Sequence, residues 1–314
     1  MKPLATEQPF VDQPSAPLVG RGLAHQHHGE LIQGVRRNEA GELVPCLVSF
    51  PLRRPGSRAR YDRNHSGCMT VSPRHKKKAL RAAALTLSRM GCDLSGHLTV
   101  DCQVPVGLGL GSSTADVVSA IKAVSNAFGV ALPAQMIAHI AVEAETAIDP
   151  VMFDQVMLFA QRRGEPIESW GPWFPRFTVV SVNVDVQSQG VDTLSLAIAI
   201  PTREEERRFD LLVDRLRSAF LRRDGRAIAE AATDSAEMNQ SQLPLPHLAD
   251  LVGLARLRGA LGVQISHSGI IAGVLFDAER GGPDADDLAA FECDLARVGV
   301  AVRCVFTTGE AAAP

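Results

Sequence analysis

The segment 105–115, Pro-Val-Gly-Leu-Gly-Leu-Gly-Ser-Ser-Thr-Ala, constrains the fold more than any other part of this chain. Residues 96–104 before it alternate between apolar and polar side chains, which predicts a half-buried β-strand. Residues 117–128 after it carry apolar side chains at helical spacing, and Gly129 predicts the end of that helix. The sequence therefore predicts a strand, a glycine-rich loop and a helix in direct succession.

The glycine-rich loop has the composition of an anion-binding site. Its glycines permit positive φ angles and let the backbone approach a ligand closely. The unpaired amides of the following helix, with the helix dipole behind them, favour a phosphate group. Neighbouring hydroxyls can donate to phosphate oxygens or bind a magnesium ion. We therefore expect the phosphates of a nucleotide to be bound by Pro105, Gly107, Gly109, Gly111, Ser112, Ser113 and Thr114.

Two familiar phosphate loops do not fit this spelling. A Walker A loop closes with Gly-Lys-Ser or Gly-Lys-Thr, whereas the nearest lysine here is Lys122, two turns into the predicted helix. The dinucleotide fingerprint needs a third glycine or alanine where this chain has Ser112 or Thr114. The remaining alternative is a tight turn whose serine only caps the helix.

Composition and charge limit the partners of the chain. Its 314 residues are 46% apolar and 21% charged, which is typical of a globular protein, and the net charge of -3 disfavours binding to nucleic acid. No apolar stretch reaches the roughly 18 residues of a membrane span, and no secretory signal is recognisable. The six cysteines lack zinc-ligand spacing and are expected to be buried thiols. We expect a cytoplasmic protein with no membrane partner, and the sequence leaves a homodimer open.

Strands interleaved with helices predict an α+β protein in two parts. Residues 1–19 are expected to form a mobile arm, and the Trp- and Pro-containing stretch 169–176 predicts a boundary between parts 20–174 and 175–314. The other predicted helices are 73–90, 133–146, 151–162, 203–223, 225–239, 248–261 and 285–297, and the other predicted strands are 178–186, 193–200, 263–266, 270–277 and 300–306.

The first predicted helix begins with a basic run, Arg74-His75-Lys76-Lys77-Lys78. Cations at a helix N-terminus oppose the helix dipole, so the run either meets an anion or forms a solvated face.

The glycine loop also resembles a known family. Its pattern Pro-x-x-x-Gly-Leu-Gly-Ser-Ser-x-Ala is similar to the central motif of the GHMP kinases, which include homoserine, mevalonate and galactose kinases. Residues 29–34, Gly-Glu-Leu-Ile-Gln-Gly, and residues 262–273 resemble motifs of the L-threonine kinase branch used in cobalamin assembly. Asp116, and Asp149 followed by Met152-Phe153, fit the same branch.

The resemblance implies a fold and an activity. The fold would be α+β, with an N-terminal ATP-binding domain at 20–174 that resembles ribosomal protein S5, and a C-terminal ferredoxin-like domain at 175–314. The active site would lie between them. The activity would be ATP- and Mg²⁺-dependent phosphorylation of a small-molecule hydroxyl group, with L-threonine or a related hydroxy amino acid as the best candidate.

The resemblance also assigns catalytic and metal-binding roles. Asp149, which precedes Pro150, is the candidate base for the acceptor hydroxyl, and the alternative is an Asx turn. Magnesium would be bound by Ser113 and Glu145, with Glu143 as the competing carboxylate.

The substrate is expected to contact Glu30, Gln33, Ser268 and Gly269, where Glu30 would pair with an ammonium group. The alternatives without a functional role are that Glu30 and Gln33 are polar residues on an edge strand, and that Ser268 and Gly269 form a plain hairpin turn. The histidines at 25, 27 and 28 could indicate a transition-metal site, but no further ligand is identifiable, and His267 is expected to be a packed or hydrogen-bonded histidine.

Three other functions share these motifs. One is a kinase for another small alcohol in a specialised pathway. The second is a decarboxylase of the mevalonate branch, which phosphorylates its substrate transiently. The third is a nucleotide-sensing protein without turnover, which the intact Ser113 and Asp149 disfavour.

Overall fold

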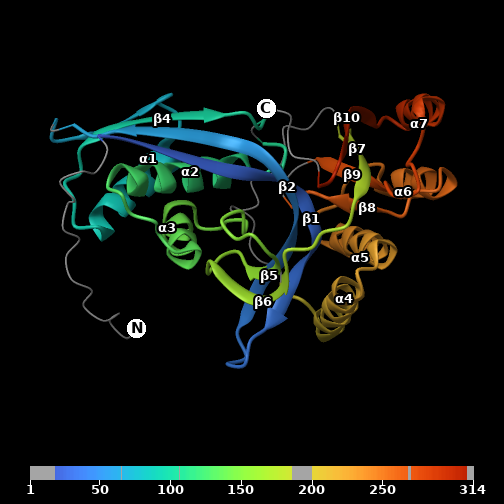
Figure 1. The fold of residues 1–314 in the computed structure, drawn as a ribbon. Helices are drawn as coiled ribbons and strands as arrows, with labels where there is room; N and C mark the ends of the chain where they lie inside the picture. The colour runs from blue at the N-terminus through green and yellow to red at the C-terminus, as the bar shows by residue number, and fades with distance from the viewer. Residues whose placement is uncertain (1–17, 65, 106, 186–199, 268–269, 310–314) are drawn as a thin grey trace.

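The computed structural model describes residues 18–64, 66–105, 107–185, 200–267 and 270–309. Its strands form one curved ten-stranded sheet in the order β10-β7-β9-β8-β1-β2-β4-β3, with β5 paired to β2 and β6 to β5 (Figure 1). The strands are β1 (Val19–Arg37), β2 (Leu43–Asp62), β3 (Met69–Ser72), β4 (Gly96–Cys102), β5 (Val156–Ala160), β6 (Glu165–Gly171), β7 (Phe177–Asn183), β8 (Gly262–Ile265), β9 (Ile271–Asp277) and β10 (Ala301–Thr307). The helices are α1 (Lys77–Arg89), α2 (Ser112–Ala127), α3 (Ala134–Glu145), α4 (Arg203–Arg222), α5 (Gly225–Met238), α6 (Leu248–Leu257) and α7 (Ala285–Arg297), with a short 3-10 turn η1 (Asn239–Ser241).

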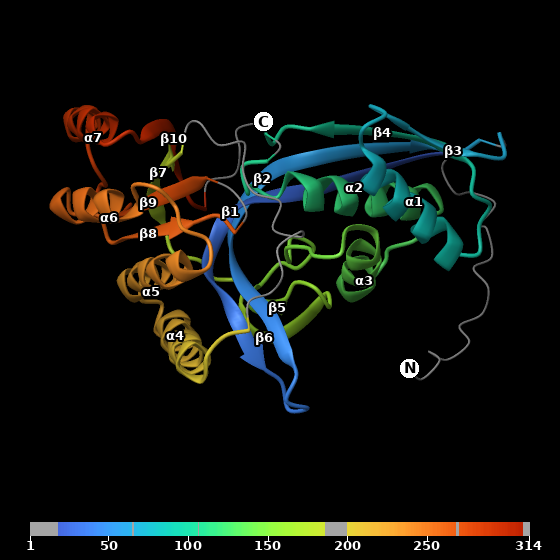
Figure 2. The same cartoon turned by 180° about the vertical axis from the view of Figure 1, so that it is seen from behind.

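The long antiparallel strands β1 and β2 run from the end of the molecule that carries α1 to its middle, where β1 pairs with β8 (Figures 1 and 2). Their register shifts several times between Ala24 and Ile32, so β1 is irregular where it passes the glycine loop. Glu30 lies opposite Ser49 on one side and Ile265 on the other. Because β1 has a neighbour on both sides at Glu30, the edge-strand alternative for this residue is wrong.

Helices α1, α2 and α3 cover one face of the sheet at its N-terminal end (Figure 2). Helix α2 is buried on nearly all sides, and β1 packs directly on its backbone at Gly20 and Gly22. The predicted alternation of β4 is confirmed, since Leu98 and Val100 are buried and Thr99 and Asp101 are not.

The basic run before and in α1 does meet anions. Helix α1 begins at Lys77, somewhat later than predicted. The Nζ atom of Lys76 lies 2.5 Å from Asp116, and that of Lys78 lies 3.1 Å from Glu145. The run therefore pairs with carboxylates of α2 and α3, which offsets its unfavourable place at a helix N-terminus.

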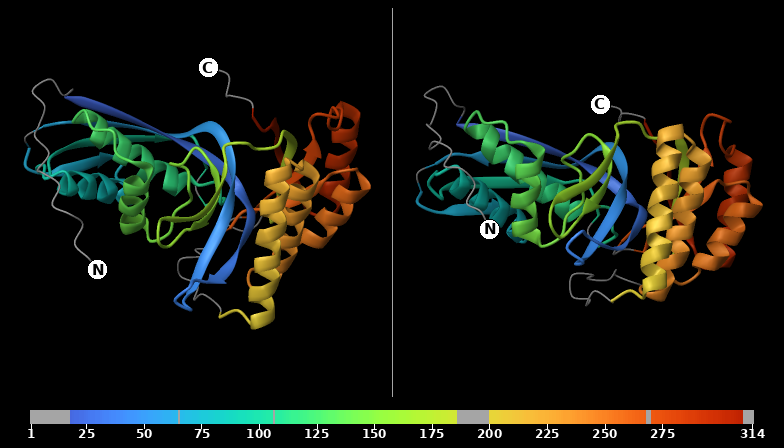
Figure 3. Two further views of the ribbon diagram at one scale, coloured as in Figure 1. Left: turned by 60° about the horizontal axis from the view of Figure 1, so that its bottom comes forward. Right: turned by 90° about the horizontal axis from the view of Figure 1, so that it is seen from below.

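Helices α4 to α7 gather at the other end of the molecule, beside strands β7 to β10 (Figure 3). Helix α4 begins with a capping box, in which Thr202 and Glu205 satisfy each other's backbone amides. The predicted helices of this part are confirmed within a few residues at their ends. The predicted strand 193–200 lies almost entirely outside the described residues, as does most of the expected N-terminal arm.

The helix predicted for 151–162 is wrong. Residues 156–160 form the buried strand β5, which makes a hairpin with β6 through a turn at Gly164 (φ +69°). A short, wholly apolar run fits a buried strand and a buried helix equally well, so periodicity could not distinguish the two.

The expectation of buried thiols is also mostly wrong, because Cys46 alone among the six cysteines is buried.

One hydrophobic cluster joins the two ends of the chain. It contains Val48 and Leu158 from the N-terminal part together with Phe177, Val213 and Leu275 from the C-terminal part. The expected parts 20–174 and 175–314 therefore share a core.

Among the described helices, none combines the length and the apolarity that crossing a membrane requires.

Candidate active site

The glycine loop has the backbone of an anion-binding loop. Gly107, Gly109 and Gly111 have φ angles of +83°, +69° and +74°, which disfavour other residues. Helix α2 begins at Ser112 with Gly111 as its N-cap, and no side chain among the described residues caps it. The alternative of a serine N-cap is therefore wrong, and the first amides of α2 are available to an anion.

Asp149 lies against the first turn of α2. After α3 ends, the Ile148 amide donates to the Gln161 carbonyl (3.0 Å), which fixes the loop that carries Asp149. The Thr114 hydroxyl donates to Oδ2 of Asp149 (3.2 Å), and Nε2 of His27 lies 2.9 Å from the same oxygen. The carboxylate is thus engaged at the glycine loop, not in an isolated Asx turn. Asp154, the nearest alternative base, is exposed.

His27 and Asp149 form a charged pair. Burial alone lowers the pKa of His27, but the charges of Asp149 and Glu30 outweigh it and raise this pKa to about 9. Burial raises the pKa of Asp149, and the contacts with His27 and Thr114 more than reverse this effect, so the net shift is downward. At neutral pH, Asp149 is therefore a carboxylate beside an imidazolium.

Glu30 is a buried carboxyl group without a hydrogen-bonding partner. The residue is 2% exposed, and neither carboxyl oxygen has a hydrogen bond within the described ranges. Its nearest cation is Nδ1 of His27, at 3.7 Å. Burial raises the pKa of Glu30 to about 8, although the charge of His27 opposes this shift. Such a group is costly to bury, and a ligand cation would satisfy it.

The histidine cluster separates in the folded chain. His28 turns away and lies against Ser181 (2.8 Å) and Gln264, and burial lowers its pKa to about 3. His27 instead faces Glu30 and Asp149, and ligand atoms of these three residues lie within 4.8 Å of one another. Sequence reasoning found no partners for His27, because Asp149 is distant in the sequence and the sequence does not show which way Glu30, three residues along, points. The histidine run itself was the one signal.

The other expected substrate residues are partly visible. The side-chain oxygen of Gln33 accepts a hydrogen bond from the ring of His267, and the backbone N–H of Gln33 donates to the Ser235 hydroxyl (3.1 Å). His267 is hydrogen-bonded, as predicted, and burial lowers its pKa. Ser268 and Gly269 lie outside the described residues.

The residues expected to bind magnesium lie together. Glu145 is buried, its Oε2 atom has no partner in the described part of the chain, and the Ser113 hydroxyl is bonded to its carboxyl group. Glu143 instead pairs with Arg89 at the surface (2.5 Å). Hydroxyl and carboxylate oxygens are the ligands that Mg²⁺ prefers, so Ser113 and Glu145 fit this ion and Glu143 does not.

Comparison with known families agrees with this geometry. The model of the GHMP kinases N terminal domain matches residues 77–159, which include α1, the glycine loop and Asp149. The chain therefore contains a GHMP kinase N-terminal domain at these residues. Two solved structures share the fold of this GHMP protein over nearly their whole length. A homoserine kinase from Cytophaga hutchinsonii has a TM-score of 0.66 at 16% identity, covering 95% of this chain and 96% of that one. A Methanococcus jannaschii mevalonate kinase has a TM-score of 0.60 at 14% identity, covering 94% and 98%.

Curated relatives of this GHMP protein are distant. It is 26% identical to an L-threonine kinase of Salmonella typhimurium over 191 residues, which cover 59% of this chain and 62% of that enzyme. It is also 26% identical to a 4-diphosphocytidyl-2-C-methyl-D-erythritol kinase of Rhizobium leguminosarum bv. trifolii, over 60% of each chain. The chain thus spans less than two thirds of these two relatives. The expected GHMP fold is confirmed, and the relatives phosphorylate different acceptors.

Proposed function

We propose that this protein is an ATP- and Mg²⁺-dependent kinase that phosphorylates the hydroxyl group of a small amino compound, with L-threonine or a related hydroxy amino acid as the best candidate. The observation that carries the proposal is that His27 lies between Asp149 and Glu30 beside the glycine loop, and that the Glu30 carboxyl oxygens have no hydrogen-bond partner among the described residues. The resemblance to L-threonine kinases and the fold of a homoserine kinase support the choice of acceptor.

In this mechanism, the loop amides and the N-terminus of α2 bind the triphosphate of ATP. Ser113 and Glu145 would hold Mg²⁺, which would neutralise charge on the phosphates. Asp149 accepts the proton of the acceptor hydroxyl as its oxygen bonds to the γ-phosphorus, and the bond from that phosphorus to the leaving ADP breaks. His27 keeps Asp149 ionised. The Thr114 hydroxyl donates a hydrogen bond to the same carboxylate oxygen and helps to position it. Glu30 pairs with the substrate ammonium.

The test is ADP release with a panel of acceptors. Threonine, serine and homoserine should exceed the matching hydroxy acids without an amino group by about 100-fold in kcat/KM, because those analogues leave Glu30 unpaired. Glu30→Gln should remove most of this preference, whereas Glu39→Gln, an exposed change in the β1–β2 turn, should leave it intact.

The outcomes separate the alternatives. Equal turnover of the deaminated analogues would disprove ammonium recognition by Glu30 but leave a kinase for another alcohol. Nucleotide binding without ADP release from any hydroxyl compound would favour a sensor and overturn the kinase proposal. Release of carbon dioxide from an isoprenoid acid would indicate the decarboxylase.

A further inference from the structure

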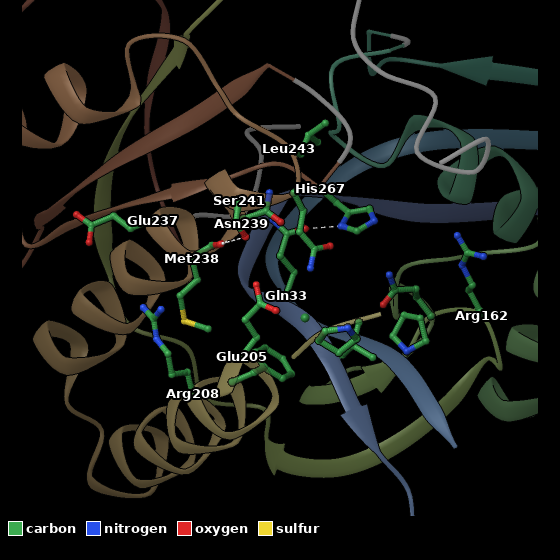
Figure 4. Close-up of a pocket in the computed structure, with 17 residues that line it drawn as sticks. Gln33, Arg162, Glu205, Arg208, Glu237, Met238, Asn239, Ser241, Leu243 and His267 are labelled. Atoms are coloured by element: carbon green, nitrogen blue, oxygen red, sulfur yellow. Dashed lines mark hydrogen bonds between the residues drawn. The ribbon is translucent and has the colours of Figure 1, made fainter. Parts of the chain in front are cut away.

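A cavity of about 550 Å³ lies beside Gln33 and His267 (Figure 4). Its walls come from β1, from the segment after β5, and from α4, the end of α5 and η1. The motifs that identify the family do not account for the residues of its far wall, such as Arg208 and Asn239.

The cavity shares a wall with the catalytic loop. Gln161 lines the cavity, while its backbone carbonyl accepts the hydrogen bond from Ile148, next to Asp149. His267 also lines the cavity and bonds to Gln33, and the charge of Asp149 acts on its pKa. A molecule whose hydroxyl group reaches Asp149 can therefore extend past His267 into this space.

The cavity is lined by two arginines and two glutamates. Both of its carboxylates are engaged elsewhere: Glu205 belongs to the capping box with Thr202, and Glu237 lies 3.6 Å from Arg256. Arg162 and Arg208 are also in the lining, and neither has an ion pair with any residue that the structure describes. Hydrogen bonds with Thr202 lower the pKa of Glu205, and the charge of Arg208 lowers it further without a direct ion pair. Both guanidinium groups therefore still have donors that an anionic ligand could take.

A buried amide adds to the polar lining. Gln161 is 6% exposed, and its Oε1 atom has no hydrogen-bond partner within the described chain. A buried amide oxygen left unpaired is costly, so a donor on a ligand would stabilise it. The cavity thus combines the amide oxygen of Gln161, which lacks a donor in the described chain, with the guanidinium groups of Arg162 and Arg208.

The size of the cavity exceeds what the proposed amino acid needs. A volume of about 550 Å³ falls within the range of roughly 300–1,000 Å³ that suits drug-sized ligands. Neither Glu30 nor Asp149 lines the cavity, so a free threonine bound at these two carboxylates would leave its arginine-bearing walls to water.

We propose that the natural acceptor is larger than a free amino acid: a hydroxyl-bearing amino compound whose extension enters this cavity and carries a carboxylate or phosphate group, bound by Arg162 on one wall and Arg208 on the other. The inference rests on the proposed kinase activity and specifies its substrate class. The phosphoryl transfer to the hydroxyl group is the same as proposed above. The anionic extension only strengthens substrate binding and positions the hydroxyl group.

The test compares C-terminally amidated dipeptides as acceptors in the ADP-release assay. L-Threonyl-L-aspartate and L-threonyl-L-phosphoserine carry the anion, and L-threonyl-L-asparagine is their neutral match. We expect the anionic dipeptides to exceed the neutral one by about tenfold or more in kcat/KM. The two anionic arms distinguish a carboxylate from a phosphate as the preferred group.

Arginine variants locate the effect. Arg162→Gln and Arg208→Gln should each reduce the ratio of anionic to neutral turnover towards one. Arg163→Gln and Arg207→Gln, which change exposed neighbours outside the cavity lining, should keep the ratio of the unmodified enzyme. A ratio near one in the unmodified enzyme, with threonine still phosphorylated, would overturn this inference and leave the kinase proposal standing. Absence of ADP release with threonine and with every dipeptide would overturn both.

Discussion

Asp149 is fixed from two sides by residues that are distant in sequence, His27 and Thr114. Asp149→Asn keeps the shape of this side chain but removes its basicity. Turnover should fall by roughly 10²–10⁴, the range typical of a lost general base, while ATP still binds. Single-turnover kinetics together with calorimetric nucleotide binding would measure both. Asp154→Asn is the matched control, and near-normal turnover of Asp149→Asn would show that the base is another group.

Glu30 predicts a pH-dependent stability. Burial raises the pKa of Glu30 from 4.5 to about 8, so the folded chain holds this proton more tightly than the unfolded chain. The stability linked to this proton is complete below about pH 4.5 and declines as the pH rises to about 8. Glu30→Gln removes that loss, so its Tm without ligand should exceed that of the unmodified protein by a margin that grows between these pH values.

Thermal unfolding at several pH values would measure this margin. Glu39→Gln should show no such trend, because its carboxyl group is exposed. A constant difference in Tm across the pH range would contradict the assigned burial of a titrating Glu30.

At the residue scale, the resemblance to the GHMP kinases pointed to the loop, Asp149, Ser113 and Glu145, and the structure places Asp149 against Thr114 and Glu145 against Ser113. The ion pair of Asp149 with His27 could not be predicted. It depends on an irregular register of β1 that brings residue 27 over the start of α2. Local sequence carries no information about such a contact.

At the scale of elements, the contact between β1 and α2 depends on glycine. A Cβ atom on Gly22 would lie 2.0 Å from the Ser119 carbonyl oxygen. Gly22→Ala should therefore push the strand from the helix and lower the free energy of unfolding by about 1–3 kcal/mol. Gly253→Ala, in α6, meets nothing within 4 Å and should raise it by about 0.5–1 kcal/mol.

Chemical denaturation of both glycine variants would test this contrast. Equal effects of the two substitutions would show that β1 can move away from α2 without cost.

Sequence periodicity predicted elements well where one face is polar, as in β4 and α4, and it also found the buried elements α2 and β9. Strands β1 and β2 were missed because histidines, prolines and glycines interrupt their alternation. Those interruptions coincide with register shifts, which only the partner strand reveals. Strand β5 was taken for a helix because its short run is apolar on both faces.

For the whole molecule, the shared core predicts cooperative unfolding. Trp170 and Trp173 pack against a cluster that includes Val48 from one part and Leu275 from the other. Tryptophan fluorescence and far-ultraviolet circular dichroism should therefore report one coincident transition. Two separable transitions would instead indicate that 20–174 and 175–314 unfold independently.

The contact between Gly111 and His27 restricts the order in which this sequence can change. A Cβ atom at 111 would lie 2.2 Å from Cδ2 of His27, so the imidazole fills the space that only glycine leaves open. A larger residue at 111 becomes sterically acceptable only after position 27 has lost its ring, and it still bears the strain of a positive φ. Losing that ring first removes the cation beside Asp149. Each single substitution, at position 111 or at position 27, is therefore harmful, so we do not expect Gly111 and His27 to be replaced one after the other.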